Sequence, residues 1–358
     1  MNQRAATILI LYTEIAQYVS SSLYHFLNRF QHVEIHLVKY PVNAEAPFEF
    51  KTTNRLYIYN RKEFDKQSLS AFADKLAPDL IMCSGWIDKD YLAVCKEFVK
   101  KIPVILAMDN HWNGSLKQRL LQLTAPFTIH KTFNKAWVPG LPQKQYALKL
   151  GFKEKQIKTG YYCGDTNSFS TFYHQFKDKK FKEFPKRFIC VARYIPAKGL
   201  ENLWQAFIDL KKDGTLQGWK LWCLGTGLDF EKRVEHKDIK HWGFIQPNAM
   251  GKFIEDTGVF ILPSRFEPWA VVVHEFAAAG FPLLISTAVG AGSEFLHEGK
   301  NGFSFPPDDI GSLKQTLLKA ASLNQLQYNA MAETSVLLSN KINLNSWSET
   351  LFDLLNNR

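Results

Sequence analysis

The stretch 259–286, VFILPSRFEPWAVVVHEFAAAGFPLLIS, constrains the fold more than any other part of the chain, because two short apolar runs enclose a helical pattern. The runs 259–262 and 283–286 have the length and composition of buried strands. The segment 267–279 predicts a helix, and Gly280 after it is a common helix stop. Strand–helix–strand units of this kind build parallel sheets, which bind ligands at the carboxyl ends of their strands. The stretch therefore predicts an α/β fold with a ligand at that edge.

Two carboxylates mark this unit. Glu267 stands where the helix should begin, and Glu275 follows eight residues later on the same helix. One acid could contact a ligand at the helix tip while the other contacts a group further along the same ligand. A helix N-terminus also favours a carboxylate without any ligand, and Glu275 could lie on a solvated face. The spacing alone leaves both interpretations open.

The start of this helix suits an anion. Pro268 is expected in the first helical turn, where its missing N–H costs nothing. We expect the backbone N–H groups near Trp269, Ala270 and Val271 to be unpaired donors in that turn. Together with the positive end of the helix dipole, they could hold a phosphate.

Length and composition predict two domains, each with a full hydrophobic core. The chain has 358 residues, of which 46% are hydrophobic and 14% aromatic. Five cysteines are scattered without metal-ligand spacing, which favours reduced thiols in a cytosol. The N-terminal apolar run 7–11 is too short for a signal sequence or a membrane span. The net charge of +10 indicates an anionic partner, and the absence of any nucleic-acid-binding motif makes nucleic acid an unexpected one.

The N-terminal half alternates short apolar strands with helices, which indicates a doubly wound parallel sheet. We expect strands at 7–12, 33–39, 55–59, 80–83, 104–108, 127–130 and 135–138, and helices at 15–30, 67–76 and 90–99 among the segments between them. The loop after the first strand, TEIAQY, has no glycine and therefore lacks a dinucleotide-binding fingerprint.

Polar residues follow the strand expected at 104–108. Asp109 and His111 stand at its carboxyl end, the edge at which open α/β sheets bind ligands. The alternative is a polar loop in which Asp109 and Asn110 cap a helix that starts near Ser115. The residues alone leave both possibilities open.

The sequence DKD at 88–90 has the form of a metal-binding aspartate pair. It stands where a helix should begin, however, and aspartate is a favoured residue at that position. We therefore expect it to cap a helix.

The C-terminal half alternates in the same way, with strands expected at 188–192, 220–224 and 239–242, a helix at 200–211, and a last amphipathic helix at 344–355. The segment 174–188, HQFKDKKFKEFPKRF, is dense in Lys and Phe. It suits a solvated linker whose aromatic side chains pack on the next domain. It also suits a patch that contacts anionic lipid through Lys and the bilayer interface through Phe.

Residues 264–284, SRFEPWAVVVHEFAAAGFPLL, resemble the E-x7-E segment of the family 4 glycosyltransferases (glycosyl transferases group 1), retaining enzymes of the GT-B fold. The family usually has Gly where this chain has Ala270. Further segments are similar to the family in the same order: GYYCGDTNSF at 160–169, VARYIPAKGLENLWQAF at 191–207, LWCLGTG at 221–227, HWGFIQPNAM at 241–250 and GKNGFSFPPDD at 299–309.

The resemblance implies two Rossmann-like doubly wound domains that face each other across a cleft. Residues 1–165 would form the acceptor side, with Gly164 and Asp165 at the hinge. Residues 166–340 would form the nucleotide-sugar donor side. Residues 341–358 would be a helix that crosses back to the N-terminal domain.

The resemblance also implies roles for individual residues. Glu275 would hold the ribose hydroxyls and Glu267 the hydroxyls of the donor sugar. Arg193 and Lys198 would neutralise the leaving diphosphate, Arg as a fixed fork and Lys as a point charge. No metal would then be needed. The segment Phe244–Ile245 would lie beside the nucleobase.

On the acceptor side, the family often has a His at the end of the strand that corresponds to 104–108. Asp109 falls nearest to that position, and His111 is two residues further on. A leaving phosphate oxygen is expected to deprotonate the acceptor, because retaining GT-B sites often lack a protein base.

The expected activity is transfer of a sugar from a UDP- or GDP-linked donor to an acceptor hydroxyl, in the synthesis of a cell-surface glycan or polysaccharide. No separate cofactor is expected. The acceptor would be a glycan or a lipid-linked molecule, and the enzyme would be cytoplasmic or at the inner face of a membrane, in contact with anionic lipid. Two other classes stay open: another GT-B enzyme such as a sugar-nucleotide epimerase, and a non-catalytic sugar-nucleotide binding module.

Overall fold

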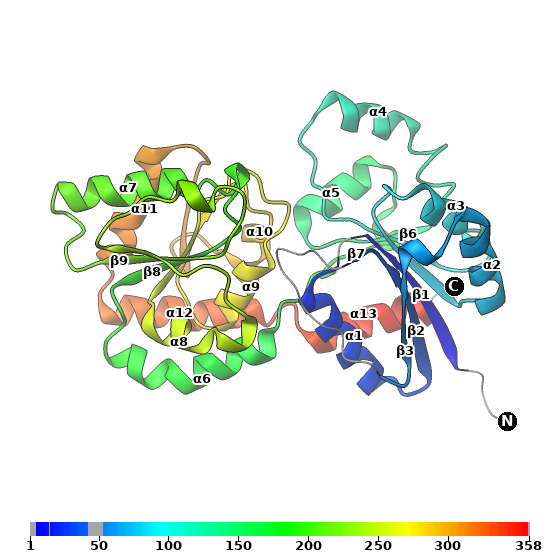
Figure 1. Cartoon of the computed structure of the whole chain (residues 1–358), viewed down its shortest axis with the longest axis horizontal. Helices are drawn as coiled ribbons and strands as arrows, with labels where there is room; N and C mark the ends of the chain where they lie inside the picture. The colour runs from blue at the N-terminus through cyan, green and yellow to red at the C-terminus, as the bar shows by residue number, and fades with distance from the viewer. Residues whose placement is uncertain (1–4, 14, 42–52, 357–358) are drawn as a thin grey trace. The chain divides into compact units, whose positions relative to one another are not determined.

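The computed structural model describes residues 5–13, 15–41 and 53–356. The chain divides into two compact units, which are best considered separately (Figure 1). Unit 1 consists of residues 1–163 together with residues 342–358, and unit 2 consists of residues 164–341.

The described residues of unit 1 form a seven-stranded parallel sheet in the order β3-β2-β1-β4-β5-β6-β7. The strands are β1 (Ala6–Tyr12), β2 (Val33–Lys39), β3 (Leu56–Asn60), β4 (Leu80–Ser84), β5 (Val104–Ala107), β6 (Lys135–Trp137) and β7 (Ile157–Lys158). The helices are α1 (Gln17–Arg29), α2 (Lys66–Leu76), α3 (Lys89–Phe98), α4 (Leu116–Thr124), α5 (Leu141–Lys149) and α13 (Leu344–Asn356).

Strand β1 runs through the middle of this sheet and is buried on both faces from Thr7 to Tyr12. It pairs in parallel with β2 and β4, so that Ile8 lies opposite Ile35 on one side and Leu80 on the other. A parallel strand covered by helices on both faces has to be apolar throughout, which accounts for the run ILILY.

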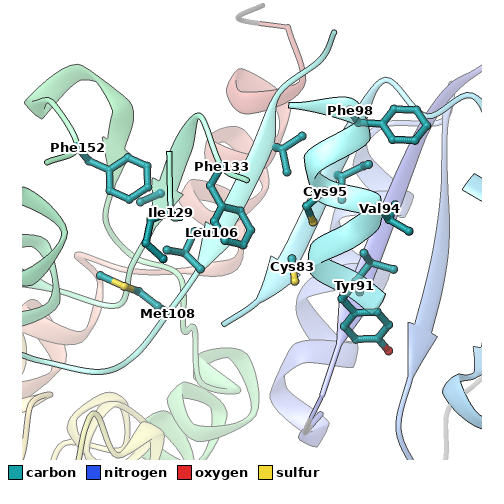
Figure 2. Close-up of a cluster of buried hydrophobic side chains, with 14 of the residues drawn as sticks. Cys83, Tyr91, Val94, Cys95, Phe98, Leu106, Met108, Ile129, Phe133 and Phe152 are labelled. Carbon is teal, nitrogen blue, oxygen red and sulfur yellow. The ribbon is translucent and has the colours of Figure 1, made fainter. Parts of the chain in front are cut away.

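The core of unit 1 on one face of the sheet lies beneath α2 and α3, while α1 and α13 lie together on the opposite face (Figure 1). Figure 2 shows Cys95 of α3 near Cys83 of β4, and Leu106 of β5 beside Phe133 and Ile129. Tyr91, Val94 and Phe98 of α3 belong to the same buried cluster. All five cysteines of the chain are buried and form no disulfide.

Helix α13 belongs to unit 1 although it lies at the other end of the sequence. The indole N–H of Trp347 donates to the carbonyl oxygen of Tyr161 at 2.7 Å. Its ring lies 5.0 Å from that of Trp137, measured between centroids. The rings of Phe30 and Phe352 stack at 4.2 Å. These contacts fix the last helix against α1 and the edge of the sheet.

The residues of unit 2 form a six-stranded parallel sheet in the order β10-β9-β8-β11-β12-β13, all of it within the described ranges. The strands are β8 (Arg187–Val191), β9 (Lys220–Leu224), β10 (Ile239–His241), β11 (Val259–Leu262), β12 (Leu283–Ser286) and β13 (Gly302–Phe305). The helices are α6 (Thr166–Lys182), α7 (Leu200–Lys212), α8 (Gly251–Asp256), α9 (Val271–Ala278), α10 (Gly292–Phe295), α11 (Ile310–Ala321) and α12 (Gln325–Ser339).

The strand orders confirm the expected fold class. Counted within each unit, the first six strands of both sheets follow the order 3-2-1-4-5-6, which is the doubly wound Rossmann arrangement. The order reverses between β1 and β4 in unit 1 and between β8 and β11 in unit 2. Ligands bind in such folds outside the carboxyl ends of the strands at this reversal.

Most expected strands are confirmed to within one or two residues, but the one at 127–130 is wrong. The N–H groups of Phe127 and Thr128 donate to the carbonyl oxygen of Thr124, and that of His130 donates to Ala125. The segment therefore continues the turns that follow α4. A short apolar run cannot distinguish a strand from a helical turn without its partners. Strands β7 and β13 were not expected separately.

The prediction that 174–188 is a linker is also wrong, because residues 166–182 form the 17-residue helix α6. Its start is capped by the Asp165 side chain, which accepts from the N–H of Ser168 at 3.2 Å. The aromatic side chains Phe169 and Tyr173 are buried against unit 2. The high Lys content concealed a helix whose stability comes from that packing.

The cations of α6 are engaged with unit 2. Lys177 pairs with Glu333 at 3.3 Å and Lys179 with Glu255 at 2.6 Å. Lys180 is buried, with its ammonium 2.9 Å from the carbonyl oxygen of Ile254 and 3.8 Å from the centroid of the Phe281 ring. Burial lowers the pKa of Lys180 from 10.5 to about 7.

We predict that Lys180→Met stabilises the protein more at pH 6 than near pH 10. The lowered pKa means that the folded state binds fewer protons than the unfolded state between about pH 7 and 10.5. The free energy of unfolding of the wild type should therefore rise from about pH 7 to pH 10.5, and below pH 7 it should stay at its lower value as far as this group is concerned. Methionine removes the buried charge, with an expected gain of roughly 1–3 kcal/mol at pH 6.

The measurement is urea unfolding followed by tryptophan fluorescence at several pH values. Lys182→Met is the matched control, because Lys182 is in the same helix and exposed. It should change stability equally at every pH. A constant difference between Lys180→Met and the wild type would contradict the prediction.

Candidate functional site

The candidate residues of unit 2 follow the carboxyl ends of its parallel strands. Arg193 comes two residues after β8 and is exposed. Phe244 follows β10 and is 41% exposed, and Ile245 beside it is half-buried. Glu267 follows β11. Parallel strands end at a common edge of the sheet. Arg193 and Glu267, which are 74 residues apart in the sequence, therefore lie at the same edge.

An ion pair joins two of these loops. The Lys198 ammonium, in the short 3₁₀ helix η3 (Pro196–Lys198), contacts Oε2 of Glu267. Each side chain keeps 14% of its surface exposed. The pair is therefore held largely away from water but can be reached from outside. A phosphate oxygen could accept from the ammonium, and a sugar hydroxyl could donate to the carboxylate.

The loop after β11 and η3 are held together by their backbones as well. The N–H of Arg265 donates to the carbonyl oxygen of Ala197 at 2.8 Å. Gly199 has φ +61°, and a Cβ there would lie 2.5 Å from the carbonyl oxygen of Pro263. Only glycine allows this backbone conformation and this approach together. Gly199 thus fixes the position of the neighbouring Lys198.

Arg265 adds a second connection between the same loops. Its guanidinium pairs with Glu201 of α7 and with Asp308 in the loop after β13, each at 2.5 Å. Sequence reasoning did not single out this residue. A charged residue in a loop carries no local signal of its partners, which here are 64 and 43 positions away.

Helix α9 begins later than expected. Its first residue is Val271, so Pro268 lies ahead of the helix and not in its first turn. Trp269 is 2% exposed, and Ala270 has φ +76° and ψ +83°. A left-handed backbone costs a residue with a Cβ roughly 1–2 kcal/mol. Glycine would avoid that cost, so this chain accepts a left-handed alanine at the position where the resemblance led us to expect Gly.

Of the three backbone donors expected in the first turn, Val271 alone is helical, and Trp269 and Ala270 precede the helix. This segment is fixed by the loop after β12. The N–H of Gly290 donates to Glu267 at 3.0 Å, and the N–H of Ala291 donates to Trp269 at 2.9 Å, both through the carbonyl oxygens. The carboxylate of Glu267 therefore projects from a braced backbone.

Glu275 lies on α9 and contacts the chain at the start of unit 2. The N–H of Asp165 lies 3.5 Å from its Oε1. Gly164 packs so closely that a Cβ there would lie 2.9 Å from Cγ of Glu275. Burial raises the pKa of Glu275 to about 7, the negative charge of Asp165 adds to that effect, and the Asp165 N–H opposes it. Glu275 therefore titrates near neutral pH and is not a solvated surface acid.

His274, the neighbour of Glu275, orders the same segment and was not anticipated. Its Nδ1 accepts from the N–H of Gly164 at 3.2 Å, and its Nε2 lies 2.9 Å from the carbonyl oxygen of Ser339. Nε2 must therefore carry the proton, since a carbonyl oxygen can only accept. This neutral histidine fixes Gly164, and with it the backbone that faces Glu275.

In unit 1, Asp109 and His111 follow β5. The hydroxyl of Tyr162 donates to the Asp109 carboxylate at 3.2 Å. Burial lowers the pKa of His111, an effect that the negative charge of Asp109 opposes. Ser115 caps α4 by accepting from the N–H of Gln118, so the alternative in which Asp109 and Asn110 cap that helix is not needed.

The DKD segment has the capping role that was expected of it. Asp88 is the N-cap of α3 and accepts from the N–H groups of Asp90 and Tyr91. Arg61 pairs with Asp88 at 2.6 Å and with Asp90 at 2.5 Å. Both aspartates are thus engaged by an arginine. Among the residues that the structure describes, no three His, Cys, Asp or Glu side chains are arranged to hold a metal ion.

Unit 1 also contains a hollow of about 480 Å³ next to the loop that follows β5. Its wall includes aromatic side chains of the β4 loop and α5 and polar side chains from the β5 loop and α4, among them Trp86, Tyr146, Asn110 and Gln118.

No helix in the described ranges is both long and apolar enough to cross a membrane.

Known proteins resemble this chain in sequence over unit 2 and in fold over nearly its whole length. Residues 173–335 match the family model described as glycosyl transferases group 1, and they lie within unit 2. An uncharacterized glycosyltransferase of Methanocaldococcus jannaschii is 29% identical over 135 residues. That alignment covers 35% of this chain and spans 34% of the length of the relative.

Two solved structures are similar over nearly the whole chain. Anabaena HepE in complex with UDP and glucose has a TM-score of 0.73 at 14% identity, covering 99% of this chain and 100% of its own. A trehalose-phosphate synthase (UDP-forming) from Burkholderia vietnamiensis has a TM-score of 0.74 at 13% identity, with coverage of 99% and 100%. These structures show the fold, which is that of the GT-B glycosyltransferases, and the family match over unit 2 supports a glycosyltransferase.

Proposed function

We propose that this protein is a retaining glycosyltransferase of family 4, which transfers a sugar from a nucleotide-sugar donor to an acceptor hydroxyl. The observation that carries the proposal is the contact between Lys198 and Glu267 at the carboxyl edge of the unit 2 sheet. The cation suits the diphosphate of the donor, and the carboxylate beside it suits the hydroxyls of the sugar attached to that diphosphate. The presence of UDP and glucose in the complex of Anabaena HepE supports a donor of this class.

Each residue of unit 2 then has a chemical task. Glu267 accepts hydrogen bonds from the sugar hydroxyls and orients the anomeric carbon. Lys198 and Arg193 stabilise the charge that develops on the diphosphate as the glycosidic bond breaks. Fixed donors aimed at developing charge are usually the largest single contribution to catalysis, and losing one costs roughly 10²–10³ in rate. Since Lys198 and Glu267 are held by braced loops, little reorganisation is needed.

The rest of the donor lies along the same edge. The N–H groups of Trp269, Ala270 and Val271 face the phosphates, and Phe244 and Ile245 lie beside the base. Glu275 accepts from the ribose hydroxyls, which favours its ionised form. The base is uracil or guanine, and UDP has the additional support of the HepE complex.

Unit 1 binds the acceptor, with Asp109 and His111 nearest to the attacking hydroxyl. Burial keeps His111 neutral near pH 7, so that it can accept or donate a hydrogen bond. The leaving phosphate oxygen takes the acceptor proton in this scheme. The product belongs to cell-surface glycan or polysaccharide synthesis in the cytoplasm.

The first experiment is a thermal-shift screen with UDP, GDP, ADP and TDP, followed by turnover of the matching sugar nucleotides with and without acceptors. A ligand at a hundred times its Kd should add about 2.7 kcal/mol of stability. Turnover that requires an acceptor supports the transferase. Turnover without one indicates an epimerase or a hydrolase, and binding with no turnover on any acceptor indicates a binding module.

We predict that the affinity for UDP rises with pH through the pKa of Glu275, and that Glu275→Gln removes this dependence. The pKa of about 7 means that the free protein is mostly protonated at pH 6 and mostly ionised at pH 8. If the ionised form binds ribose, Kd should fall about tenfold over this range. Calorimetry in both proteins corrects for the titration of UDP itself. Equal pH dependence in the two proteins would contradict a ribose contact.

We predict that Glu267→Gln leaves the affinity for UDP within about twofold but lowers turnover by roughly 10²–10³. UDP lacks the sugar that Glu267 contacts, so its binding should depend little on this carboxylate. Glu333→Gln on the exposed surface of α12 is the matched control. Turnover at the wild-type rate in Glu267→Gln would remove the residue from the site.

We predict that activity survives a chelator, because Arg193 and Lys198 supply the positive charge at the diphosphate. The assay compares initial rates after dialysis against EDTA with and without added magnesium or manganese. Rates that fall in EDTA and recover with either cation would show that a metal takes part.

A further inference from the structure

Helix α4 exposes an apolar stripe. Its three outward leucines are among the most exposed large apolar side chains of the described chain: Leu116 is 84% exposed, Leu120 63% and Leu123 75%. Phe127, one turn beyond the helix end, is 70% exposed. None of the residues 116–124 is buried. Figure 1 shows α4 at the outer edge of unit 1, beyond α5.

The stripe is a consequence of ordered packing and not of a loose helix. The four residues have the spacing i, i+4, i+7 and i+11, which places them along one side of a helix. Leu121, on another side, packs against the core of unit 1. The Gln118 side chain donates to the carbonyl oxygen of His111 at 2.8 Å and accepts from the N–H of Asn113 at 2.8 Å. The helix is thus attached by one face, and its apolar side points to solvent.

The stretch of sequence that contains the stripe carries charge of a single sign. Residues 110–153 contain no Asp or Glu but seven basic residues, which are Lys117, Arg119, Lys131, Lys135, Lys144, Lys149 and Lys153. At 100° per residue, Lys117 and Arg119 flank the stripe on its two sides. The ammonium of Lys131 lies 5.9 Å from the centroid of the Phe127 ring. Exposed leucine and phenylalanine bordered by cations suit the interface of an anionic bilayer.

Two other candidate surfaces within residues 53–356 lack this combination. In the segment 174–188, in which the sequence suggested a lipid-binding patch, Phe184 and Phe188 are buried. Lys177 and Lys179 of this segment are paired with acids. Of the remaining strongly exposed leucines of the described residues, Leu228 lies in a loop, and Leu326 and Leu337 lie on α12 with the exposed acid Glu333 between them. Neither place has an apolar stripe bordered only by cations.

We propose that α4 and the following turn, residues 115–131, dock unit 1 on an anionic lipid bilayer. The three leucines and Phe127 enter the interface, and Lys117, Arg119 and Lys131 contact lipid phosphates. This surface would bring the transferase to an acceptor held in the membrane. Only the acceptor in the membrane rests on the proposed function. Binding of α4 to lipid does not depend on it, so the test involves no sugar transfer.

The test is co-sedimentation of the full-length protein with vesicles of phosphatidylcholine alone and with 30% phosphatidylglycerol added. We expect binding to the anionic vesicles at low salt, at least tenfold weaker binding to the neutral ones, and loss of most binding at high salt. The variant Leu120→Ser/Leu123→Ser/Phe127→Ser should reduce binding at least tenfold. So should Lys117→Glu/Arg119→Glu.

Matched controls are Leu326→Ser/Leu337→Ser and Lys237→Glu/Lys252→Glu, which make similar changes at exposed positions of unit 2. They should bind as the wild type does, and circular dichroism and thermal unfolding should show that all variants fold. Tryptophan emission of a Phe127→Trp variant should shift to the blue on anionic vesicles, which places this residue in the interface.

Three results would overturn the proposal. The first is equal binding of the α4 variants and the controls. The second is no shift of Trp emission while the protein sediments with vesicles. The third is dimerisation, measured by sedimentation velocity, that the α4 variants abolish while no variant changes vesicle binding, since α4 would then be an interface between two copies of the chain. Loss of transferase activity with retained vesicle binding would instead concern only the proposed function.

Discussion

Parallel strand pairing is the constraint on which the rest of this structure depends. Every pair of named strands in the described ranges is parallel, so each strand needs a crossover before the next can pair. The crossovers are helices that cover both faces, and the strands must be apolar on both sides. All loops that follow strands then emerge at one edge. Residues as distant in sequence as Lys198 and Glu267 come into contact there because the fold brings the ends of β8 and β11 together.

Close backbone approach holds that edge in place. Two glycines leave no space for a side chain. A Cβ at Gly199 would lie 2.5 Å from the carbonyl oxygen of Pro263, and a Cβ at Gly225 of the LGTG segment would lie 2.0 Å from that of Ala192. The same tightness at Gly164 packs the backbone against the partly buried Glu275, and burial raises the pKa of this carboxyl to about 7. Packing thus determines where the charged groups lie and at which pH Glu275 becomes ionised.

The composition of helices α4 and α6 does not show whether their apolar sides are buried or exposed. Both contain large apolar side chains and basic residues. In α6, Phe169 and Tyr173 are buried against the rest of unit 2. Lys177 and Lys179 meet acids, and Lys180 meets a carbonyl oxygen. In α4, the apolar side faces solvent because the opposite side, with Leu121 and Gln118, is the one attached to unit 1. Neither helix could be assigned to a surface or to the core from its residues, since the difference lies in the partners.

The sequence by itself determined the fold class and the position of most strands, because fully buried parallel strands are short apolar runs with clear boundaries. Strand β2 and strands β9, β11 and β12 have the bounds expected from that pattern. It also predicted that Arg193 and Lys198 follow one strand, which is β8, and that Glu267 and Glu275 follow another, which is β11. Only the tertiary structure decided that Lys198 and Glu267 are paired, that α9 begins at Val271 after a left-handed Ala270, and that residues 127–130 are turns. It also decided that Glu275 is partly buried behind Gly164. These features depend on contacts between residues far apart in the chain, for which local periodicity and propensity carry no information.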